Sequence, residues 1–338
     1  MTIKFDRILL EHGGGGLLSN ELIAKTFLPL LKNPLLEELQ DGAVFEVGGT
    51  KLCFTTDSYV VHPRFFPGGD IGSLAVHGTV NDIAMCGGVP LVLSAGFILE
   101  EGFPMEELER IVRSMAVAAK SAGVVVATGD TKVVPRGAVD GLFINTSGIG
   151  VIRYGGVLSV RSIRPGDAVL VSGPIGDHGA AILSAREDLG FASAVASDSA
   201  PLNGLVETIL AASNEIHCMR DATRGGLGAI LAEIAGQSGM RITIREEAIP
   251  VRDEVRGICE ILGFDPLFLA NEGRMALFCP AESAETVLRA MRGHERGQDA
   301  TIIGTVTEDR RGRVVLETII GGSREIDLPT GELVPRIC

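Results

Sequence analysis

An alternation of apolar strand, glycine turn and helix runs through this sequence, restarts halfway along it, and constrains the fold more than any other feature. The first part contains the helical pattern GGDIGSLAVHGTVNDIAMCGGVP followed by the strand pattern LVLSAGFIL, and the second part restarts in RPGDAVLVSGPIGDHGAAILSARE. Such alternation is typical of mixed α/β domains. Because 338 residues are long for one domain and comfortable for two, we expect an N-terminal domain over 1–160, a C-terminal domain over 161–320 and an irregular, mobile tail over 321–338.

Further elements are expected in both domains. In the first, PMEELERIVRSMAVAAKSAG predicts a helix that ends at Gly123, VVVATGDTKVV predicts a buried strand that runs into a polar loop, and GLFINTSGIGVI predicts another strand. In the second, helices are expected over 224–237 and 281–292, and strands over 241–245, 300–307 and 313–318 and after ANEG.

The composition disfavours several classes of function. The formal net charge of −13 disfavours nucleic acid and anionic lipid as partners. No run of about 20 apolar residues predicts a membrane span, and the first residues lack the apolar segment of a secretory signal. The six cysteines include no C-x-x-C pair and mostly lie in apolar surroundings, which favours small buried side chains in a reducing cytoplasm over zinc ligands.

Four aspartates stand at the ends of apolar runs: Asp41, Asp57, Asp82 and Asp130. A carboxylate in such a position destabilises the folded state unless it is paired or bound to a cation. Several converging carboxylates suit Mg²⁺, a hard cation that binds carboxylate and phosphate oxygens together. Each aspartate alone has the alternative interpretation of a turn or cap residue, but four together favour a metal and phosphate site.

Lys132 follows Asp130 by two residues, so in an extended segment both side chains point to the same face. A lysine beside a metal-binding acid suits a phosphate group. The alternative is a surface ion pair, which is common and contributes little stability.

Two glycine-containing motifs suggest contact with phosphate. HGGGG at 12–16 would let backbone N–H groups approach an anion, but it lacks the sequence of a Walker loop, and a flexible N-terminal arm is an equal alternative. DATRGG at 221–226 opens an expected helix, so Asp221 is interpreted as a cap or metal ligand, and Gly225 and Gly226 as a seat for phosphate.

Two further residues are candidates for direct chemistry. Glu272 in LANEGRMA lies in a polar break between two apolar strands, where it is either a general base or a turn acid. Cys338 is the last residue of the sequence, and a thiol there has a long reach, which favours attachment of a group over a structural role. His178 in GDHG is interpreted as a cap or a buried histidine at a helix start.

Taken in order, the segments GDIGSLAVHGTVNDIAMCGGVP, TGDTKVV, GDHG, DATRGGL, ANEG and the final PRIC resemble the HypE family of hydrogenase maturation factors. That family lies within the ATP-binding superfamily of aminoimidazole ribonucleotide synthetase (PurM), to which VNDIAM and DATRGGL belong, whereas PRIC singles out the HypE family. The resemblance spans the whole chain. It implies two mixed α/β domains of the PurM-like type and a homodimer that holds ATP at a β-barrel shared by two N-terminal domains.

The resemblance also implies an activity and its partners. A carbamoyltransferase, HypF, places a carbamoyl group on the terminal thiol, and ATP then drives dehydration of this group to a thiocyanate. The cyano group passes to iron held by HypC and HypD and supplies the cyanide ligands of nickel–iron hydrogenase. Cys338 would therefore carry the reacting group.

ATP and Mg²⁺ are the cofactors that the resemblance implies. The residues expected to bind the nucleotide and its metal are Asp41, Asp57, Asp82, Asp130, Asp221, Gly225 and Gly226. Mg²⁺ held by Asp57, Asp82 and Asp130 would neutralise the phosphates. Lys132 would stabilise the transferring phosphoryl group, and Glu272 is the candidate base, with Lys132 as the alternative.

Other interpretations stay open at this point. Selenophosphate synthetase and thiamin monophosphate kinase share the superfamily pattern, although the former relies on a reactive residue near its N-terminus and no cysteine precedes Cys53 here. A non-enzymatic carrier, whose tail binds the groove of a partner, is the third possibility. For the enzyme, Cys338 has to visit both the HypF site and its own ATP site. We therefore expect a tail that points outward without nucleotide and inward, toward Lys132 and Glu272, with nucleotide.

Overall fold

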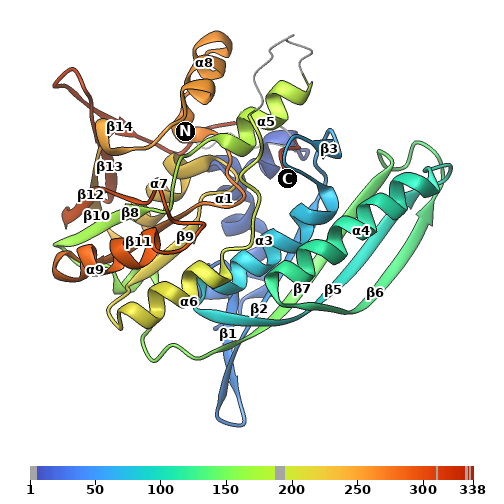
Figure 1. Ribbon diagram of the computed structural model, residues 1–338, viewed down its shortest axis with the longest axis horizontal. Coiled ribbons are helices and arrows are strands. Elements are labelled where there is room, and N and C mark those ends of the chain that lie inside the picture. Colours follow the sequence, from blue (N-terminus) through green and yellow to red (C-terminus); the bar gives the residue numbers. More distant parts are fainter. Residues whose placement is uncertain (1–5, 187–194, 310, 332–333, 335) are drawn as a thin grey trace.

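The computed structural model describes residues 6–186, 195–309, 311–331, 334 and 336–338, and it contains two large mixed sheets, one in each half of the chain (Figure 1). The first sheet has the order β1-β2-β7-β5-β6. Its strands are β1 (Ala43–Val47), β2 (Thr50–Tyr59), β5 (Gly88–Glu100), β6 (Val125–Val134) and β7 (Leu142–Ile152). Only β5 and β6 are parallel, because helix α4 (Met105–Ala122) crosses between them.

Helix α3 (Ile71–Met85) is the central element of the molecule. It begins at Asp70, whose carboxylate accepts the N–H groups of Gly72 and Ser73. Nearly every side of this helix is buried, because it packs on the first sheet and α4 and also contacts β9 and α6 of the second half. A helix in this position can present a polar side chain to a site between the halves.

The second sheet has the order β14-β13-β10-β12-β8-β11-β9. Its strands are β8 (Asp167–Val171), β9 (Cys218–Asp221), β10 (Met240–Arg245), β11 (Met275–Pro280), β12 (Thr301–Glu308), β13 (Arg313–Glu317) and β14 (Ser323–Ile326). Alternate residues of β8 face opposite layers: Val169 and Val171 pack with α7 (Gly226–Ser238), whereas Leu170 packs with α6 (Asn203–Ala212) and α9 (Ala281–Arg292). Helices therefore cover both faces of this sheet.

The remaining elements are short. The helices are α1 (Leu17–Leu22), the π-turn η2 (Ile23–Phe27), α2 (Leu28–Leu31), α5 (Asp177–Arg186) and α8 (Asp253–Leu262). The 3₁₀ turns are η1 (Leu10–Gly13), η3 (Leu36–Glu38), η4 (Val160–Ser162), η5 (Glu246–Ala248) and η6 (Pro266–Phe268), and β3 (Phe65–Phe66) pairs with β4 (Gly69–Asp70). No helix in the described part of the chain has both the length and the apolar run needed to cross a bilayer.

The mixed α/β class and most of the expected elements are confirmed, with two corrections. The segment VVVATGDTKVV is not a buried strand that runs into a loop: β6 continues to Val134 and is exposed over 125–133, since it is the last strand of its sheet. The segment after Gly321 is not irregular throughout, because β14 pairs with β13 and buries Ile326 opposite Val314. Neither sheet closes into a barrel among the described residues, so a barrel shared by two copies stays a prediction.

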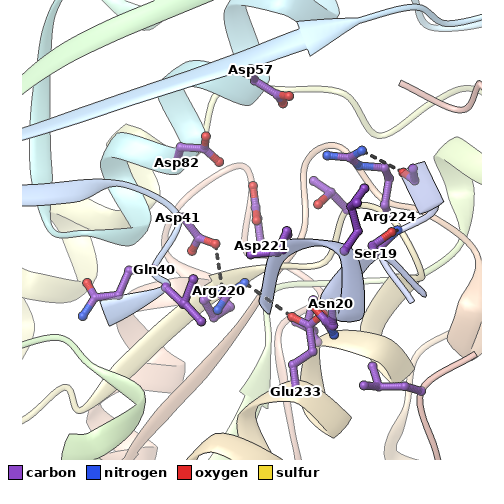
Figure 2. A pocket seen from close by; sticks show the side chains of 18 of the residues that line it. Ser19, Asn20, Gln40, Asp41, Asp57, Asp82, Arg220, Asp221, Arg224 and Glu233 are labelled. Atoms are coloured by element: carbon purple, nitrogen blue, oxygen red, sulfur yellow. Dashed lines mark hydrogen bonds and ion pairs between the residues drawn. The ribbon is translucent and has the colours of Figure 1, made fainter. Parts of the chain in front are cut away.

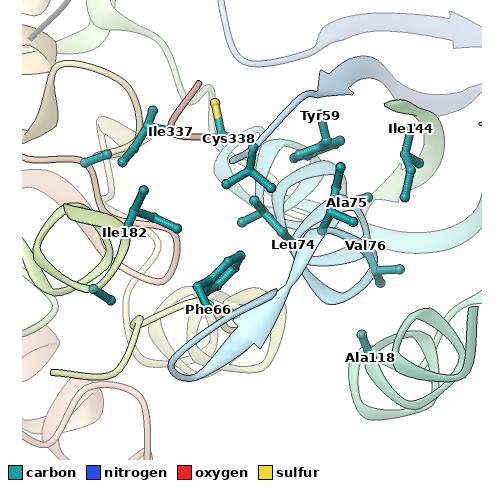
Figure 3. Close-up of a cluster of buried hydrophobic side chains, with 14 of the residues drawn as sticks. Tyr59, Phe66, Leu74, Ala75, Val76, Ala118, Ile144, Ile182, Ile337 and Cys338 are labelled. Carbon is teal, nitrogen blue, oxygen red and sulfur yellow. The ribbon is translucent and has the colours of Figure 1, made fainter. Parts of the chain in front are cut away.

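The described end of the tail lies between the two halves. The N–H of Val60 donates to the carbonyl oxygen of Cys338 at 3.0 Å, and the N–H of His62 donates to that of Arg336 at 3.1 Å. The tail thus runs antiparallel to the chain that follows β2. Figure 3 shows Ile337 and Cys338 among apolar side chains that come from both halves. The described end of the tail thus points inward, while an outward position and the dependence on nucleotide stay predictions.

Candidate active site

A cavity of about 840 Å³ lies between the two halves, and acidic side chains dominate its polar wall. The acids that line it are Asp41, Asp57, Asp82, Asp221, Glu233 and Glu272. Figure 2 shows the four aspartates arranged around one common space. Cys338 lines the same cavity. The structure therefore brings together most of the residues that the sequence singled out.

The predicted acids that line the cavity come from different parts of the fold. Asp57 lies on β2, Asp82 on α3, and Asp221 is the last residue of β9. Asp41 immediately precedes the β1 hairpin, and Glu272 lies in the loop between η6 and β11. The strand ends and the buried helix face hold these side chains at fixed positions, so the site depends on the packing of both halves.

Asp82 lies in an unfavourable electrostatic environment on the buried helix α3. Burial, followed by the negative charges of Asp221 and Asp41, raises the pKa of Asp82 well above its ordinary value. Thr55 partly offsets this by donating its hydroxyl to Asp82 Oδ2 at 2.7 Å. Burial and nearby carboxylates likewise raise the pKa of Asp221 to about 8. These groups concentrate negative charge that a cation would relieve.

One acid has its own counter-ion. Asp41 Oδ1 lies 2.7 Å from Arg220 Nε, and Glu233 Oε2 lies 3.7 Å from Arg220 NH2. Arg220 is the residue immediately before Asp221, so β9 supplies both a cation and an acid to the wall. Sequence reasoning missed Arg220, although an arginine next to the DATRGG motif was the available signal.

Glu272 is almost completely buried, and its Oε1 atom has no hydrogen-bond partner among the described residues. Burial, followed by the charges of Asp221 and Asp57, raises the pKa of Glu272 well above its ordinary value. A buried acid without a partner for one oxygen is costly in a purely structural role. It fits a group that accepts a proton from a ligand in the cavity.

The carboxylates fit a Mg²⁺ ion that is shared with phosphate, not one enclosed by protein alone. No three Asp, Glu, His or Cys side chains within the described ranges are close enough to form a metal centre by themselves. Mg²⁺ commonly takes one or two protein carboxylates and completes its shell with phosphate oxygens and water. Asp57 and Asp82 both line the cavity and could supply one or two such carboxylates.

Asp130 and Lys132 lie elsewhere. Both side chains are exposed on β6, where Lys132 Nζ pairs with Asp130 Oδ2 at 2.9 Å, and neither residue lines the cavity. The hydrogen bond from Lys132 lowers the pKa of Asp130. Within one copy of the chain this pair is a surface ion pair. Its predicted role in catalysis requires that another molecule be placed against β6.

The two predicted phosphate-binding glycines have a local structural explanation. Gly225 and Gly226 have φ values of +76° and +64°, and a Cβ on Gly226 would lie 2.5 Å from the carbonyl oxygen of Leu269. Only glycine fits such a backbone. Both residues stand at the start of α7, and neither lines the main cavity. Their contact with phosphate stays a prediction.

The HGGGG segment contributes to the cavity after all, through Gly13 and Gly15. Arg224 NH1 donates to the carbonyl oxygen of Gly13 at 2.9 Å, and Ser19 Oγ accepts the N–H of Gly15 at 2.9 Å. Arg224 also lines the cavity, and the negative charge of Cys338 is the largest cause that raises the pKa of Arg224. Sequence reasoning did not assign Arg224, although it stands within DATRGG.

Comparison with known proteins places the chain in a family. Residues 39–152 match the family described as AIR synthase related protein, N-terminal domain, and residues 164–317 match the corresponding C-terminal domain. The chain is 56% identical to the carbamoyl dehydratase HypE of Azotobacter vinelandii over 338 residues, which cover 100% of this chain and 99% of that relative.

Two solved structures are similar over nearly the whole length. A crystal structure of a HypE–HypF complex has a TM-score of 0.86 and 50% identity, covering 91% of this chain and 99% of that chain. A crystal structure of HypE in complex with ATP has a TM-score of 0.83 and 51% identity, covering 98% of this chain and 100% of that chain. Similarity at this level favours the dehydratase interpretation over the kinase, selenophosphate synthetase and carrier interpretations.

Proposed function

This chain belongs to the HypE family of carbamoyl dehydratases, and we propose that its acidic cavity uses ATP to dehydrate an S-carbamoyl group on Cys338 to a thiocyanate. One observation carries the proposal. Cys338 is only 8% exposed and lines the same cavity as the aspartates and Glu272. The group to be converted and the residues suited to ATP and proton transfer thus share one space.

The chemistry requires removal of the amide oxygen and of both N–H protons. The amide oxygen attacks the γ-phosphorus of ATP, and the bond between that phosphorus and the bridging oxygen breaks to release ADP. The carbon–oxygen bond then breaks, and the oxygen leaves as phosphate while the carbon–nitrogen triple bond forms. The balanced products are thiocyanate, ADP, phosphate and one proton. Phosphorylation is needed because phosphate is a far better leaving group than hydroxide.

Glu272 is the proposed base for the N–H protons. Its raised pKa makes the ionised carboxylate a stronger base than an exposed glutamate. Its unpartnered Oε1 provides the acceptor atom. Lys132 stays the alternative.

Mg²⁺, when bound, would neutralise the nucleotide phosphates and so favour phosphoryl transfer. Asp57 and Asp82 are the proposed ligands from one copy. We place Asp130 and Lys132 of a second copy at the same site, since β6 is an exposed edge strand and a homodimer across it would bring that pair to a neighbouring molecule. The other nucleotide contacts proposed are Asp41, Asp221, Gly225 and Gly226.

The partners follow from the family. A relative that is 50% identical to this chain was crystallised with HypF, so HypF is the proposed source of the carbamoyl group. The proposed acceptor of the cyano group is iron carried by a HypC–HypD complex, and the proposed location is the cytoplasm.

Intact mass spectrometry tests the proposal. After incubation with HypF, carbamoyl phosphate and Mg-ATP, the wild-type chain should gain first the carbamoyl and then the cyano mass. Cys338→Ala should gain neither, while it keeps its circular dichroism spectrum and its ATP affinity. A Cys338→Ala chain that still gains the cyano mass would overturn the assignment. A carbamoylated chain that hydrolyses no ATP would support the carrier interpretation instead.

A further inference from the structure

His178 connects the docked tail to the polar network of the second half. Its Nε2 atom lies 2.8 Å from the carbonyl oxygen of Ile337, and its Nδ1 atom lies 2.8 Å from Ser197 Oγ. A carbonyl oxygen can only accept, so Nε2 carries the proton, and Nδ1 accepts from the Ser197 hydroxyl. Burial lowers the pKa of His178 to about 4, which agrees with a neutral ring. The direction of both hydrogen bonds is thereby fixed.

Ser197 begins a turn that forms hydrogen bonds with both the N–H and the carbonyl oxygen of Glu272. Ser197 Oγ accepts the N–H of Ser199 at 3.0 Å. The Asp198 carboxylate accepts the N–H of Glu272 at 3.0 Å, and the N–H of Ala200 donates to the carbonyl oxygen of Glu272 at 3.3 Å. The position of Glu272 therefore depends on the geometry of residues 197–200.

Close packing makes this turn and the Glu272 loop one unit. A Cβ on Gly273 would lie 2.0 Å from the carbonyl oxygen of Asp198, so the glycine of ANEG is required for their contact. Asn81 Nδ2 donates to the carbonyl oxygens of Ala200 at 3.1 Å and Glu272 at 3.3 Å. A shift of the turn is thus transmitted to Glu272.

We propose that His178 is a positioning residue that couples docking of the tail to the placement of Glu272, through the turn that Ser197 begins. The inference rests on the proposed function, in which the tail brings the substrate and Glu272 is the base. A docked Ile337 carbonyl holds the proton on Nε2, and this leaves Nδ1 as the acceptor that orients Ser197. When the tail leaves, the Ile337 carbonyl no longer holds the proton on Nε2, so Nδ1 no longer fixes the orientation of the Ser197 hydroxyl. The base is then less well placed, and ATP hydrolysis without a docked substrate is suppressed.

The competing explanation is that His178 only packs or only anchors the tail. Its ring meets Phe66 edge-on, with centroids 5.4 Å apart, so it does contribute to packing. Two variants separate these roles. His178→Gln keeps an N–H donor near the Nε2 position and loses the Nδ1 acceptor, whereas His178→Asn keeps an acceptor near Nδ1 and loses the donor to Ile337. Ser197→Ala breaks the next link without touching the tail.

The test uses full-length chain carbamoylated by HypF, with thiocyanate measured by intact mass and ADP measured in parallel. All three variants should form thiocyanate about tenfold more slowly, which corresponds to the loss of one buried hydrogen bond, and ADP release should fall in parallel, because a misplaced base suppresses ATP hydrolysis. His178→Gln and Ser197→Ala should keep the wild-type resistance of the tail to trypsin, and His178→Asn should lose it. His217→Gln, a change at a histidine that pairs with Asp167 outside the cavity, is the matched control.

Each result decides the proposal. If His178→Gln and Ser197→Ala behave like wild type while His178→Asn is slow, the histidine only anchors the tail and the coupling is wrong. If all three match wild type, His178 has no positioning role. If the wild-type chain forms no thiocyanate, the proposed function fails first. If circular dichroism shows that a His178 variant does not fold, the result for Ser197→Ala decides the proposal. That change removes only one hydroxyl, from a half-buried position.

Discussion

At the scale of single residues, the cavity holds carboxylates whose mutual repulsion the protein has to tolerate. Asp82, Asp221 and Glu272 all have raised pKa values, and burial is the largest cause for each. Such groups destabilise the folded state once they ionise. Retaining them is reasonable only if a bound cation or a proton from the substrate relieves the repulsion.

Asp221 gives a prediction for stability against pH. Its pKa is about 8 in the folded chain and 3.8 ordinarily, so the folded state binds the proton more tightly, and stability falls as pH rises from about 4 to 8. Asp221→Asn removes this effect. The variant should match wild type near pH 4 and exceed it by roughly 5 kcal/mol at pH 8. Urea unfolding across this range checks it, with Asp6→Asn, an exposed site, as control. If the free energy of unfolding changes with pH in the same way in Asp221→Asn and in wild type, the raised pKa does not belong to Asp221.

Asp82 gives a prediction for turnover. Asp82→Asn keeps the volume and an oxygen that can accept from Thr55, but it removes the negative charge proposed to bind Mg²⁺. ATP turnover by carbamoylated chain should fall roughly 100-fold, the usual effect of losing an electrostatic contact to the transition state. Circular dichroism should be unchanged. If both turnover and the spectrum stay at wild-type values, Asp82 is only a buried polar residue of α3.

At the scale of elements, local sequence patterns correctly predicted the helices and strands whose formation depends on residues close together in the sequence. Helices α3 and α4 and strand β10 follow from periodicity and from end signals such as Pro104 and Gly123. The exposure of β6 did not follow, because an apolar strand is buried or exposed according to its neighbours in the sheet. Three acids of the cavity, Asp41, Asp57 and Asp82, were predicted because each ends an apolar run, but Asp130 of the same set lies elsewhere and Glu233 was not predicted. Arg220 was not, because its partner Asp41 is 179 residues away in sequence and only the fold brings them together.

The exposed strand β6 gives a prediction about assembly. Among the described strands β6 pairs with β5 alone, and Val125, Val126 and Val133 are exposed on it. If a second copy covers this strand, Val126→Lys should place a charge in the interface. The variant should then be monomeric by light scattering and should lose ATP turnover. Val117→Lys, an equally apolar exposed position on α4, is the control and should stay dimeric. A Val126→Lys dimer with full turnover would exclude β6 from the site.

At the scale of the whole molecule, the tail is held by contacts from both halves. The N-terminal half contributes the N–H of Val60 and the Asp140 carboxylate, which pairs with Arg336. The C-terminal half contributes Arg186, which donates to the carbonyl oxygen of Arg336 at 2.6 Å. A tail held in this way keeps Cys338 in the wall of the cavity. To meet HypF, these contacts have to break together, so docking should depend on how well the two halves are held against each other.

Trypsin can report whether nucleotide changes this equilibrium. Docked, the Arg336 side chain donates to the carbonyl oxygen of Val60 and pairs with Asp140, so it cannot enter the specificity pocket of a protease. ATP bound between the halves can favour docking only by the difference in its contacts with the two states. Mg-ATP should therefore slow cleavage after Arg336, while cleavage after Arg311, in an exposed loop, serves as the internal control and stays constant. Asp140→Asn removes the charged partner of Arg336 and should speed cleavage severalfold, because a charged hydrogen bond is lost. Equal rates after Arg336 with and without Mg-ATP, in the wild type and in the variant, would show that the tail has one position and that loading of Cys338 by HypF takes place by another route.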